Sequence, residues 1–370
     1  MLRAYKYRLY PNSSQRELFE KQFGTCRFVY NWALDLKSTT YLNDNRSVNK
    51  NDLKKMLPGL KAQYNWLKDV NSQSLQGSID NLDKAFQKFF RKEAEYPAFK
   101  SKNNPVQSFH IPQHYVVDLD NGMIKLPKLK EPVRVKFHRR FEGETKTATV
   151  SRTPTGKYFI SILVEDGREI PEKVSSGPSI GVDVGISHFA ILSTSEKIEN
   201  PRYLKKSLRK LQHEQRALSR KKKGSSNRKK QKLVVAKLHE KIASQRNDFH
   251  HKLSNRLVNE NQVIVLEDLN ISGMVKSHCL AQAISDVAWG SFIMKLKYKA
   301  EWCGKTIQQI GRFVPSSKLC SICGYKNTDL TLNDRSWECP SCHTKHDRDV
   351  NAAINILNIA LNNTAAGTAV

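Results

Sequence analysis

Three carboxylates in three distant segments have the surroundings expected of metal-binding acids. Asp183 lies within the apolar run Ser179–Ile186, Glu267 ends an apolar run that begins at Val263, and Asp349 starts a segment with helical apolar spacing. Burying a carboxylate in an apolar strand costs free energy unless the acid is paired or holds a cation. Two Mg²⁺ ions about 4 Å apart can activate a water and stabilise the leaving oxygen of a phosphodiester. The three acids therefore predict a two-metal site for phosphodiester cleavage.

Each acid, taken alone, also has a simpler explanation. Asp183 could accept hydrogen bonds from backbone amides, and Glu267 and Asp268 could be surface charges at the end of a strand. Asp349 or Asp347 could cap the helix that follows. The joint presence of three acids in suitable elements favours the metal site.

Four cysteines form the most specific pattern in the chain. Two Cys-x-x-Cys pairs are separated by 15 residues, which falls within the spacing of zinc ribbons. Four thiolates give a closed tetrahedral site, so a structural Zn²⁺ is expected. His343 and His346 are nearby and could replace a ligand. The predicted ligands are Cys320, Cys323, Cys339 and Cys342.

The charge balance points to a polyanionic partner. The chain of 370 residues has 62 Lys and Arg against 35 Asp and Glu, a formal net charge of +27. A field of this sign favours nucleic acid. No apolar stretch reaches the roughly 18 residues that a membrane span needs, and the N-terminus has no secretory pattern. A membrane partner is therefore not expected.

The first 170 residues predict one helical and one β-rich region. Residues 2–10 are expected to form a strand, and Ser14-x-x-Glu17 predicts a capping box for a helix. A break at Gly24 would divide that helix into a hairpin, with a DNA-reading helix–turn–helix as a further possibility. Five short β-rich runs follow between 115 and 164. They predict a small barrel or sheet, completed by strand 2–10 and interrupted by a helical insertion.

The acids require a second unit in which strands and helices position them. Strands are expected at 179–186, 188–194, 263–269 and 306–314, and helices at 204–262 (a pair), 284–304 and 349–361. Strands and helices around one mixed sheet indicate an α/β fold. Gly181 and Gly185 beside Asp183 would let another backbone approach closely.

A basic run interrupts the predicted helix pair. Residues 220–232 hold eight basic side chains and no acid, with Gly-Ser-Ser at the centre. A nuclear-localisation signal is the alternative to a nucleic-acid contact. The candidate contacts are Arg220, Lys221, Lys222, Lys223, Arg228, Lys229 and Lys230.

Motifs spread along nearly the whole chain resemble one family. Four of them are the most specific: Leu218–Ser225, Glu267-Asp-Leu-Asn, Pro315-Ser-Ser-Lys-x-Cys and Asp347-Arg-Asp-Val-Asn-Ala-Ala. With Gly181-Val-Asp-Val-Gly, they make the sequence resemble the OrfB/TnpB family of insertion-sequence proteins, relatives of type V CRISPR effector nucleases.

The resemblance implies a RuvC-like nuclease of the RNase H fold with Asp183, Glu267 and Asp349 as its catalytic acids. It selects Asp349 over Asp347 and Glu267 over Asp268. The implied domains are a wedge-like β-barrel (1–10 and 105–170) and a helical recognition lobe (11–104). A nuclease domain (171–314 and 346–370) and an inserted zinc ribbon (315–345) complete the chain.

The resemblance also implies partners and activity. The expected function is RNA-guided, Mg²⁺-dependent cleavage of double-stranded DNA by a monomer bound to guide RNA, linked to transposition and recombination. Its expected location is the prokaryotic cytoplasm, associated with the nucleoid. Strand transfer by a transposase and a non-catalytic nucleic-acid-binding regulator are the alternatives.

Overall fold

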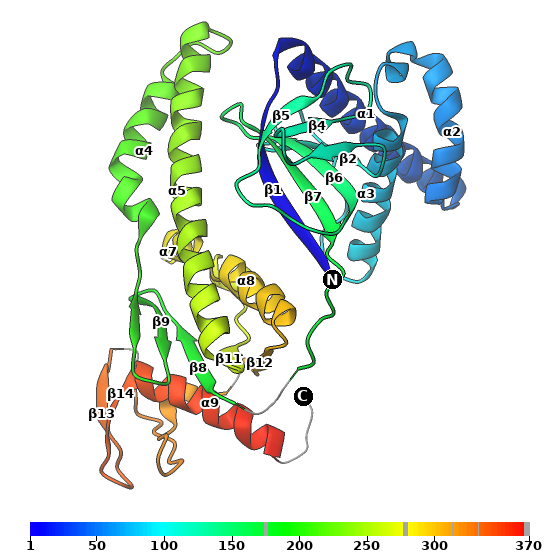
Figure 1. Cartoon of the computed structure of the whole chain (residues 1–370). Helices are drawn as coiled ribbons and strands as arrows, with labels where there is room; N and C mark the ends of the chain where they lie inside the picture. The colour runs from blue at the N-terminus through cyan, green and yellow to red at the C-terminus, as the bar shows by residue number, and fades with distance from the viewer. Residues whose placement is uncertain (174–176, 277–279, 313, 332, 366–370) are drawn as a thin grey trace. The chain divides into compact units, whose positions relative to one another are not determined.

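The computed structural model describes residues 1–173, 177–276, 280–312, 314–331 and 333–365. The parts of the expected elements and domains at 174–176, 277–279, 313, 332 and 366–370 lie outside the described residues. The chain divides into two compact units, Met1–Arg168 and Glu169–Val370 (Figure 1).

Unit 1 contains an antiparallel seven-stranded sheet in the order β2-β6-β7-β1-β5-β4-β3. Strand β1 pairs with β7 and β5, so the N-terminal segment joins this sheet as expected. Strand β2 was not anticipated. The strands are β1 (Leu2–Tyr10), β2 (Gln107–Ile111), β3 (Val116–Asp118), β4 (Met123–Lys125), β5 (Val133–Lys136), β6 (Glu144–Arg152) and β7 (Tyr158–Glu165).

Three helices lie between β1 and β2: α1 (Ser13–Asp44), α2 (Lys50–Gln63) and α3 (Ser72–Phe90), with a 3₁₀ turn at Asn65–Lys68. The expected break at Gly24 is wrong, because α1 runs through it without interruption. The expected capping box is also misplaced. Asn12 caps the helix, and the Asn12 and Gln15 side chains each accept a hydrogen bond from the other residue's backbone N–H.

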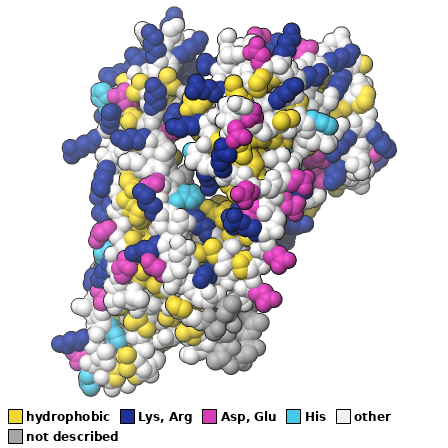
Figure 2. Space-filling model, viewed as in Figure 1, with side chains coloured by type: hydrophobic (Ala, Val, Ile, Leu, Met, Phe, Trp, Pro, Cys, Tyr) yellow, Lys and Arg dark blue, Asp and Glu magenta, His cyan; other side chains and the backbone are white. Residues whose placement is uncertain are grey.

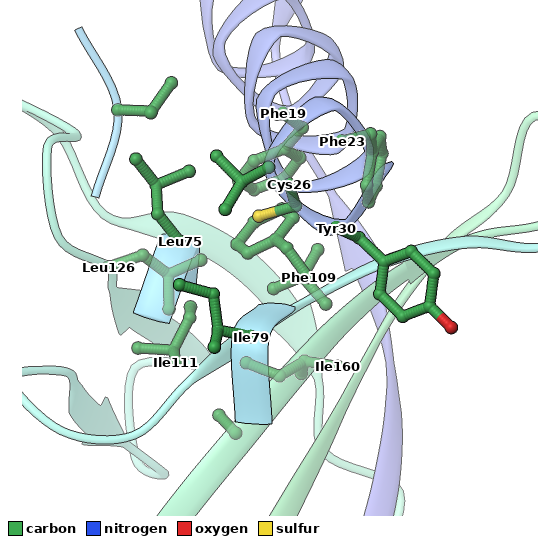
Figure 3. Packing of buried hydrophobic residues seen from close by; sticks show 14 of the residues in the cluster. Phe19, Phe23, Cys26, Tyr30, Leu75, Ile79, Phe109, Ile111, Leu126 and Ile160 are labelled. Carbon is green, nitrogen blue, oxygen red and sulfur yellow. The ribbon is translucent and has the colours of Figure 1, made fainter. Parts of the chain in front are cut away.

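The core of unit 1 joins these helices to the sheet. Phe19 and Phe23 from α1 lie against Phe109 from β2, with ring centroids 5.8 and 5.3 Å apart (Figure 3). Leu75 and Ile79 of α3 are fully buried in the same cluster. Burial of apolar area on this scale explains why α1 tolerates a glycine in its interior.

Unit 2 contains a mixed five-stranded sheet in the order β10-β9-β8-β11-β12. Strands β8, β9 and β10 pair antiparallel, whereas β11 runs parallel to both β8 and β12. The bounds are β8 (Ser179–Val184), β9 (His188–Leu192), β10 (Lys197–Glu199), β11 (Val263–Glu267) and β12 (Thr306–Ile310).

Helices cover both faces of this sheet. Ile264 and Leu266 share a core with α5 and α8, while Val263 and Val265 share a core with α9. Burial on both faces explains the continuous apolar run of β11. The helices are α4 (Tyr203–Ser219), α5 (Ser226–Glu260), α6 (Ile271–Met274), α7 (Ala281–Val287), α8 (Trp289–Trp302) and α9 (Arg348–Ala365).

Two further expectations about unit 2 have clear outcomes. The single helix expected at 284–304 is wrong, because Ala288 adopts a left-handed conformation (φ 53°) and separates α7 from α8. The close backbone approach expected at Gly181 is confirmed, since a Cβ there would lie 2.1 Å from the carbonyl oxygen of Ala353 in α9. Among the helices of the described residues, none is long and apolar enough to cross a membrane.

Candidate functional site

Asp183 stands on β8 at the centre of the unit 2 sheet. Its strand pairs with β9 on one side and β11 on the other, and α9 packs closely over Gly181. Burial raises the pKa of the Asp183 carboxyl to about 8, and the charges of Glu267 and Asp349 add to the increase. The structure therefore brings the three predicted acids into one electrostatic neighbourhood.

Glu267 and Asp268, neighbours at the end of β11, have different surroundings. The Ser316 hydroxyl donates a 2.5 Å hydrogen bond to Glu267 Oε1. Asp268 instead forms an ion pair with Arg312, 2.6 Å from its Nε, and both side chains are more than two-fifths exposed. Glu267 therefore has a hydrogen-bonded partner and acts on Asp183 through its charge, while Asp268 holds a surface pair.

Asp347 and Asp349 also have different surroundings. The Asp347 carboxylate accepts hydrogen bonds from the backbone N–H groups of Asp349 and Val350, which is the contact of a helix N-cap. Its other oxygen lies 2.5 Å from Lys197 Nζ. Asp349 lies in the first turn of α9, with Arg335 Nη1 3.7 Å from its Oδ2. The capping explanation therefore applies to Asp347 and leaves Asp349 to influence Asp183.

The donor set of the three acids fits a divalent cation. Carboxylate oxygens are the ligands that Mg²⁺ prefers, and a pKa of about 8 means that Asp183 needs a nearby positive charge to ionise near neutral pH. The positive charge of Arg348 already lowers this pKa, but burial and the two acids outweigh it. The oxygens of the three acids are not tightly grouped. Among the described residues, the potential metal-ligand atoms that all lie within 4.8 Å of one another are the sulfurs of the four cysteines.

The four predicted cysteines do come together. Their Sγ atoms all lie within 4.8 Å of one another, with Cys320 and Cys342 at 3.6 Å and Cys323 and Cys339 at 3.5 Å. Burial raises the pKa of Cys320 to about 11, whereas hydrogen bonds with Thr344 lower that of Cys342 to about 6. A bound Zn²⁺ would stabilise all four as thiolates, so the cluster fits this metal.

The two cysteine pairs are built alike. In each, the residue after the second cysteine donates its N–H to the carbonyl of the first and has positive φ: Gly324 (φ 75°) and His343 (φ 58°). His343 is exposed and turned toward Glu338, so the structure assigns it to the turn. His346 instead approaches Cys320, with its Nε2 3.1 Å from the sulfur.

Polar side chains of α9 connect the cysteine cluster to the acids. Asn351 accepts a hydrogen bond from Ser321 N and donates one to Leu319 O, and Asn355 donates to the carbonyls of Ser316 and Leu319. These contacts were not predicted as functional. The only sequence signal was that Ser316 and Asn351 lie within the family motifs and Asn355 lies two residues after one of them.

The predicted basic contacts lie at the α4–α5 turn. Lysine and arginine side chains are frequent along these helices (Figure 2). Arg228 is directed toward the turn itself, because its Nη1 donates to the carbonyls of Leu218 and Lys221. Lys229 and Lys230 lie near the N-terminus of α5, whose first turn contains no acidic residue. Positive side chains are unfavourable at a helix N-terminus, so a bound anion would stabilise this end of α5.

Comparisons with known proteins match several parts of the chain. Residues 160–278 match the OrfB_IS605 family, described as "Probable transposase", and residues 289–356 match the "Cas12f1-like, TNB domain". Residues 1–46 match a helix-turn-helix domain of the same family, although here this segment is a strand followed by one continuous helix.

One structural and two sequence relatives cover nearly the whole chain. The chain shares its α/β fold with the protein in a structure titled "Cryo-EM structure of the Cas12f1-sgRNA-target DNA complex". The TM-score is 0.58 at 14% identity, over 94% of this chain and 83% of the other. Two relatives are both named "Putative RNA-guided DNA endonuclease". The Streptomyces pristinaespiralis protein is 40% identical, over 99% of this chain and 91% of the relative. InsQ of Escherichia coli (strain K12) is 33% identical, over 96% and 92%.

The mixed α/β fold thus resembles that of the Cas12f1 protein in that complex. The chain belongs to the OrfB/TnpB family of insertion-sequence proteins.

Proposed function

We propose that this protein is an RNA-guided endonuclease that cleaves double-stranded DNA with Mg²⁺ held by Asp183, Glu267 and Asp349. The observation that carries the proposal is the raised pKa of Asp183, about 8, which burial causes and to which the charges of Glu267 and Asp349 add. The sequence relatives match nearly the whole chain, and their names are the basis for proposing an RNA guide and a DNA substrate. The mixed sheet with acids on β8 and β11 supports a RuvC-like nuclease domain of the RNase H fold.

The chain's own residues would prepare the site for this reaction. Mg²⁺, when bound, would activate a water and stabilise the leaving oxygen of the phosphodiester. Ser316 donates to one oxygen of Glu267 and so orients the other. Arg335 and Arg348 place positive charge beside the acids, which would favour approach of a phosphate.

The domain assignment follows from the same proposal. Residues 1–10 and 105–170 would form the wedge-like β-barrel and 11–104 the recognition lobe. Residues 171–314 and 346–370 would form the nuclease domain, with 315–345 as the zinc ribbon. The net charge of +27 suits a guide RNA and a target duplex held mainly through phosphates. A monomer bound to RNA and located near the nucleoid remains part of the proposal.

The test is cleavage of a plasmid library by protein co-expressed with RNA from its element's flank. The library carries a guide match beside randomised bases. Asp183→Asn, Glu267→Gln and Asp349→Asn should each lower the cleavage rate by at least about 100-fold, since each would remove several kcal/mol of transition-state stabilisation. Asp268→Asn and Asp347→Asn are matched controls and should cleave within about threefold of the parent. Asp268 only forms a surface ion pair with Arg312, and Asn at position 347 can still cap α9.

Equal cleavage by the three variants and the controls would contradict the proposed site. Strand transfer is the competing reaction, favoured by the description of the matched family as a transposase. It would appear as donor ends joined to target DNA rather than as free cut ends.

A further inference from the structure

A cavity of about 340 Å³ lies within unit 1, far along the sequence from the acids. Side chains from α1, α3, β2 and β6 line it, together with the segment 100–106. Phe23, Cys26 and Phe109 form its apolar side, where α1 meets β2 (Figure 3). Its size falls within the range of small-ligand sites.

The lining is cationic and contains no acid. Arg27 and Lys100 are its two basic residues, and neither forms an ion pair among the described residues. The Lys100 Nζ lies 3.8 Å from the centroid of the Tyr30 ring. Burial lowers the pKa of Lys100, while the residue as a whole is exposed, so an approaching anion can reach its ammonium group.

The cationic side of the cavity is held in place by hydrogen bonds. The Asn31 side chain accepts from the Lys100 backbone N–H (2.7 Å) and donates to the Lys100 carbonyl (3.0 Å). Gln107 accepts from Arg27 Nη1 (3.0 Å) and donates to the carbonyl of Asn104 (3.0 Å). The Arg27 guanidinium and the backbone of Lys100 are therefore positioned before any ligand binds.

The remaining lining offers neutral polar groups. The described contacts leave the side-chain amides of Asn81 and Asn104 without a hydrogen bond, and both amides can donate and accept. The hydroxyl of Ser108 and the ring of His110 also line the cavity. Burial lowers the pKa of His110, which favours its neutral form.

We propose that this cavity binds one unpaired nucleotide of a nucleic-acid strand, with its phosphate at Lys100 and Arg27. Its base would lie within reach of the exposed Asn81 and Asn104 amides, above the largely buried rings of Phe23 and Phe109. Hydrogen bonding to the edge of an unpaired base and cationic contact with its phosphate are general means of binding single strands. The inference rests on the proposed function only in taking nucleic acid as the partner.

Photo-crosslinking of the full chain tests the proposal. The probes are 12-nucleotide single strands of mixed sequence, one DNA with a central 4-thiothymidine and one RNA with a central 4-thiouridine. We expect crosslinked peptides that contain Phe23, Asn81 or Phe109. The strand that crosslinks better identifies DNA or RNA as the source of the nucleotide, and a 12-base-pair duplex with the same probe should crosslink less.

Variants separate the cavity from general charge. Lys100→Gln should lower crosslinking to these peptides about tenfold, the loss expected for one charged hydrogen bond. Lys102→Gln is the matched control, because Lys102 is exposed and lies outside the lining. It should lower crosslinking less than twofold. Ser108→Trp fills the cavity from an exposed position without changing charge and should abolish these crosslinks, with an unchanged melting temperature as the check on folding.

Two results would overturn the proposal: equal losses for Lys100→Gln and Lys102→Gln, or crosslinks that persist in folded Ser108→Trp. Failure of the proposed nuclease is distinguishable, because Asp183→Asn should crosslink normally while failing to cleave.

Discussion

At the scale of single residues, a hydroxyl distinguishes the two acids at the end of β11. Ser316 is buried and donates to Glu267, while Asp268 is occupied by Arg312 at the surface. The Ser316 backbone is itself held, because its carbonyl accepts a hydrogen bond from Asn355 of α9. Ser316 is therefore a positioning residue for the carboxylate of Glu267.

Removal of that hydroxyl should weaken the site without eliminating it. We expect Ser316→Ala to lower Mg²⁺ affinity or cleavage about 10–100-fold, the usual effect of losing a group that orients a metal ligand. Cleavage measured across a Mg²⁺ titration should show a raised half-saturation concentration. The neighbouring Ser317→Ala is the control, and an unchanged Mg²⁺ requirement in Ser316→Ala would show that the hydroxyl does not orient Glu267.

His250 should make the stability of unit 2 depend on pH. Its side chain is fully buried, and its Nε2 lies 3.0 Å from the Val287 carbonyl. Burial lowers its pKa from 6.5 to about 4, helped by the nearby charges of Lys295, Arg246 and His251. The unfolded chain therefore binds a proton at a higher pH than the folded chain. Stability from this residue is complete above pH 6.5 and is lost as the pH falls toward 4, by about 1.4 kcal/mol per unit.

Urea denaturation between pH 4 and 7.5 measures this dependence. His250→Gln keeps a donor for Val287 but cannot titrate, so its unfolding free energy should fall less between pH 6.5 and 4 than that of the parent. His239→Gln, at an exposed position, should follow the parent. Parallel curves for His250→Gln and the parent would show that His250 does not carry the effect.

At the scale of elements, α9 links the cysteine cluster to the acid site. Asn351 and Asn355 bond the segment 316–321, which leads into the first cysteine pair, and Arg335 from the same region lies beside Asp349. Folding of the cysteine region is therefore coupled to the position of Asp349 and, through Ser316, to that of Glu267.

Loss of the metal should consequently reduce both order and activity. We expect the purified protein to contain one Zn²⁺ per chain, and Cys323→Ser to lose it, because closed four-thiolate sites need every ligand. Hydrogen exchange should then accelerate in 316–347 and in the first turn of α9, with β1–β7 of unit 1 unchanged. Cys303→Ser, at an exposed thiol outside the cluster, should keep the metal. Full zinc content in Cys323→Ser would contradict the four-cysteine site.

Elements were predictable from the sequence where a short residue pattern determines them, but not where tertiary contacts determine them. The strands β8 and β11 and the Cys-x-x-Cys pairs were predictable, because burial and metal ligation select residue types locally. The parallel pairing of β8 with β11 was not, although it brings Asp183 toward Glu267. Gly24 is a poor helix residue by itself, yet packing of Phe23 and Cys26 keeps α1 continuous. The left-handed Ala288 carries no glycine or proline signal.

At the scale of the whole molecule, the net charge of +27 means that contacts with phosphates would contribute most of the affinity for a nucleic acid. Lysines differ in how much they can contribute. Among the described residues, Lys221, Lys222 and Lys223 at the α4–α5 turn form no ion pair, whereas Lys50, Lys54 and Lys252 already pair with aspartates. A lysine that is already neutralised by an acid releases fewer counterions when nucleic acid binds.

The salt dependence of RNA binding should therefore separate the two groups of lysines. Replacing Lys221, Lys222 and Lys223 by Gln should lower the slope of log affinity against log salt concentration by about 2, since each phosphate contact contributes about 0.7–0.9. The triple replacement of Lys50, Lys54 and Lys252 removes the same formal charge and should change the slope by less than about 1. Filter binding of the flanking RNA between 50 and 400 mM salt measures both. Equal slopes for the two variants would mean that affinity follows total charge, and that the α4–α5 turn is not a specific contact for the RNA.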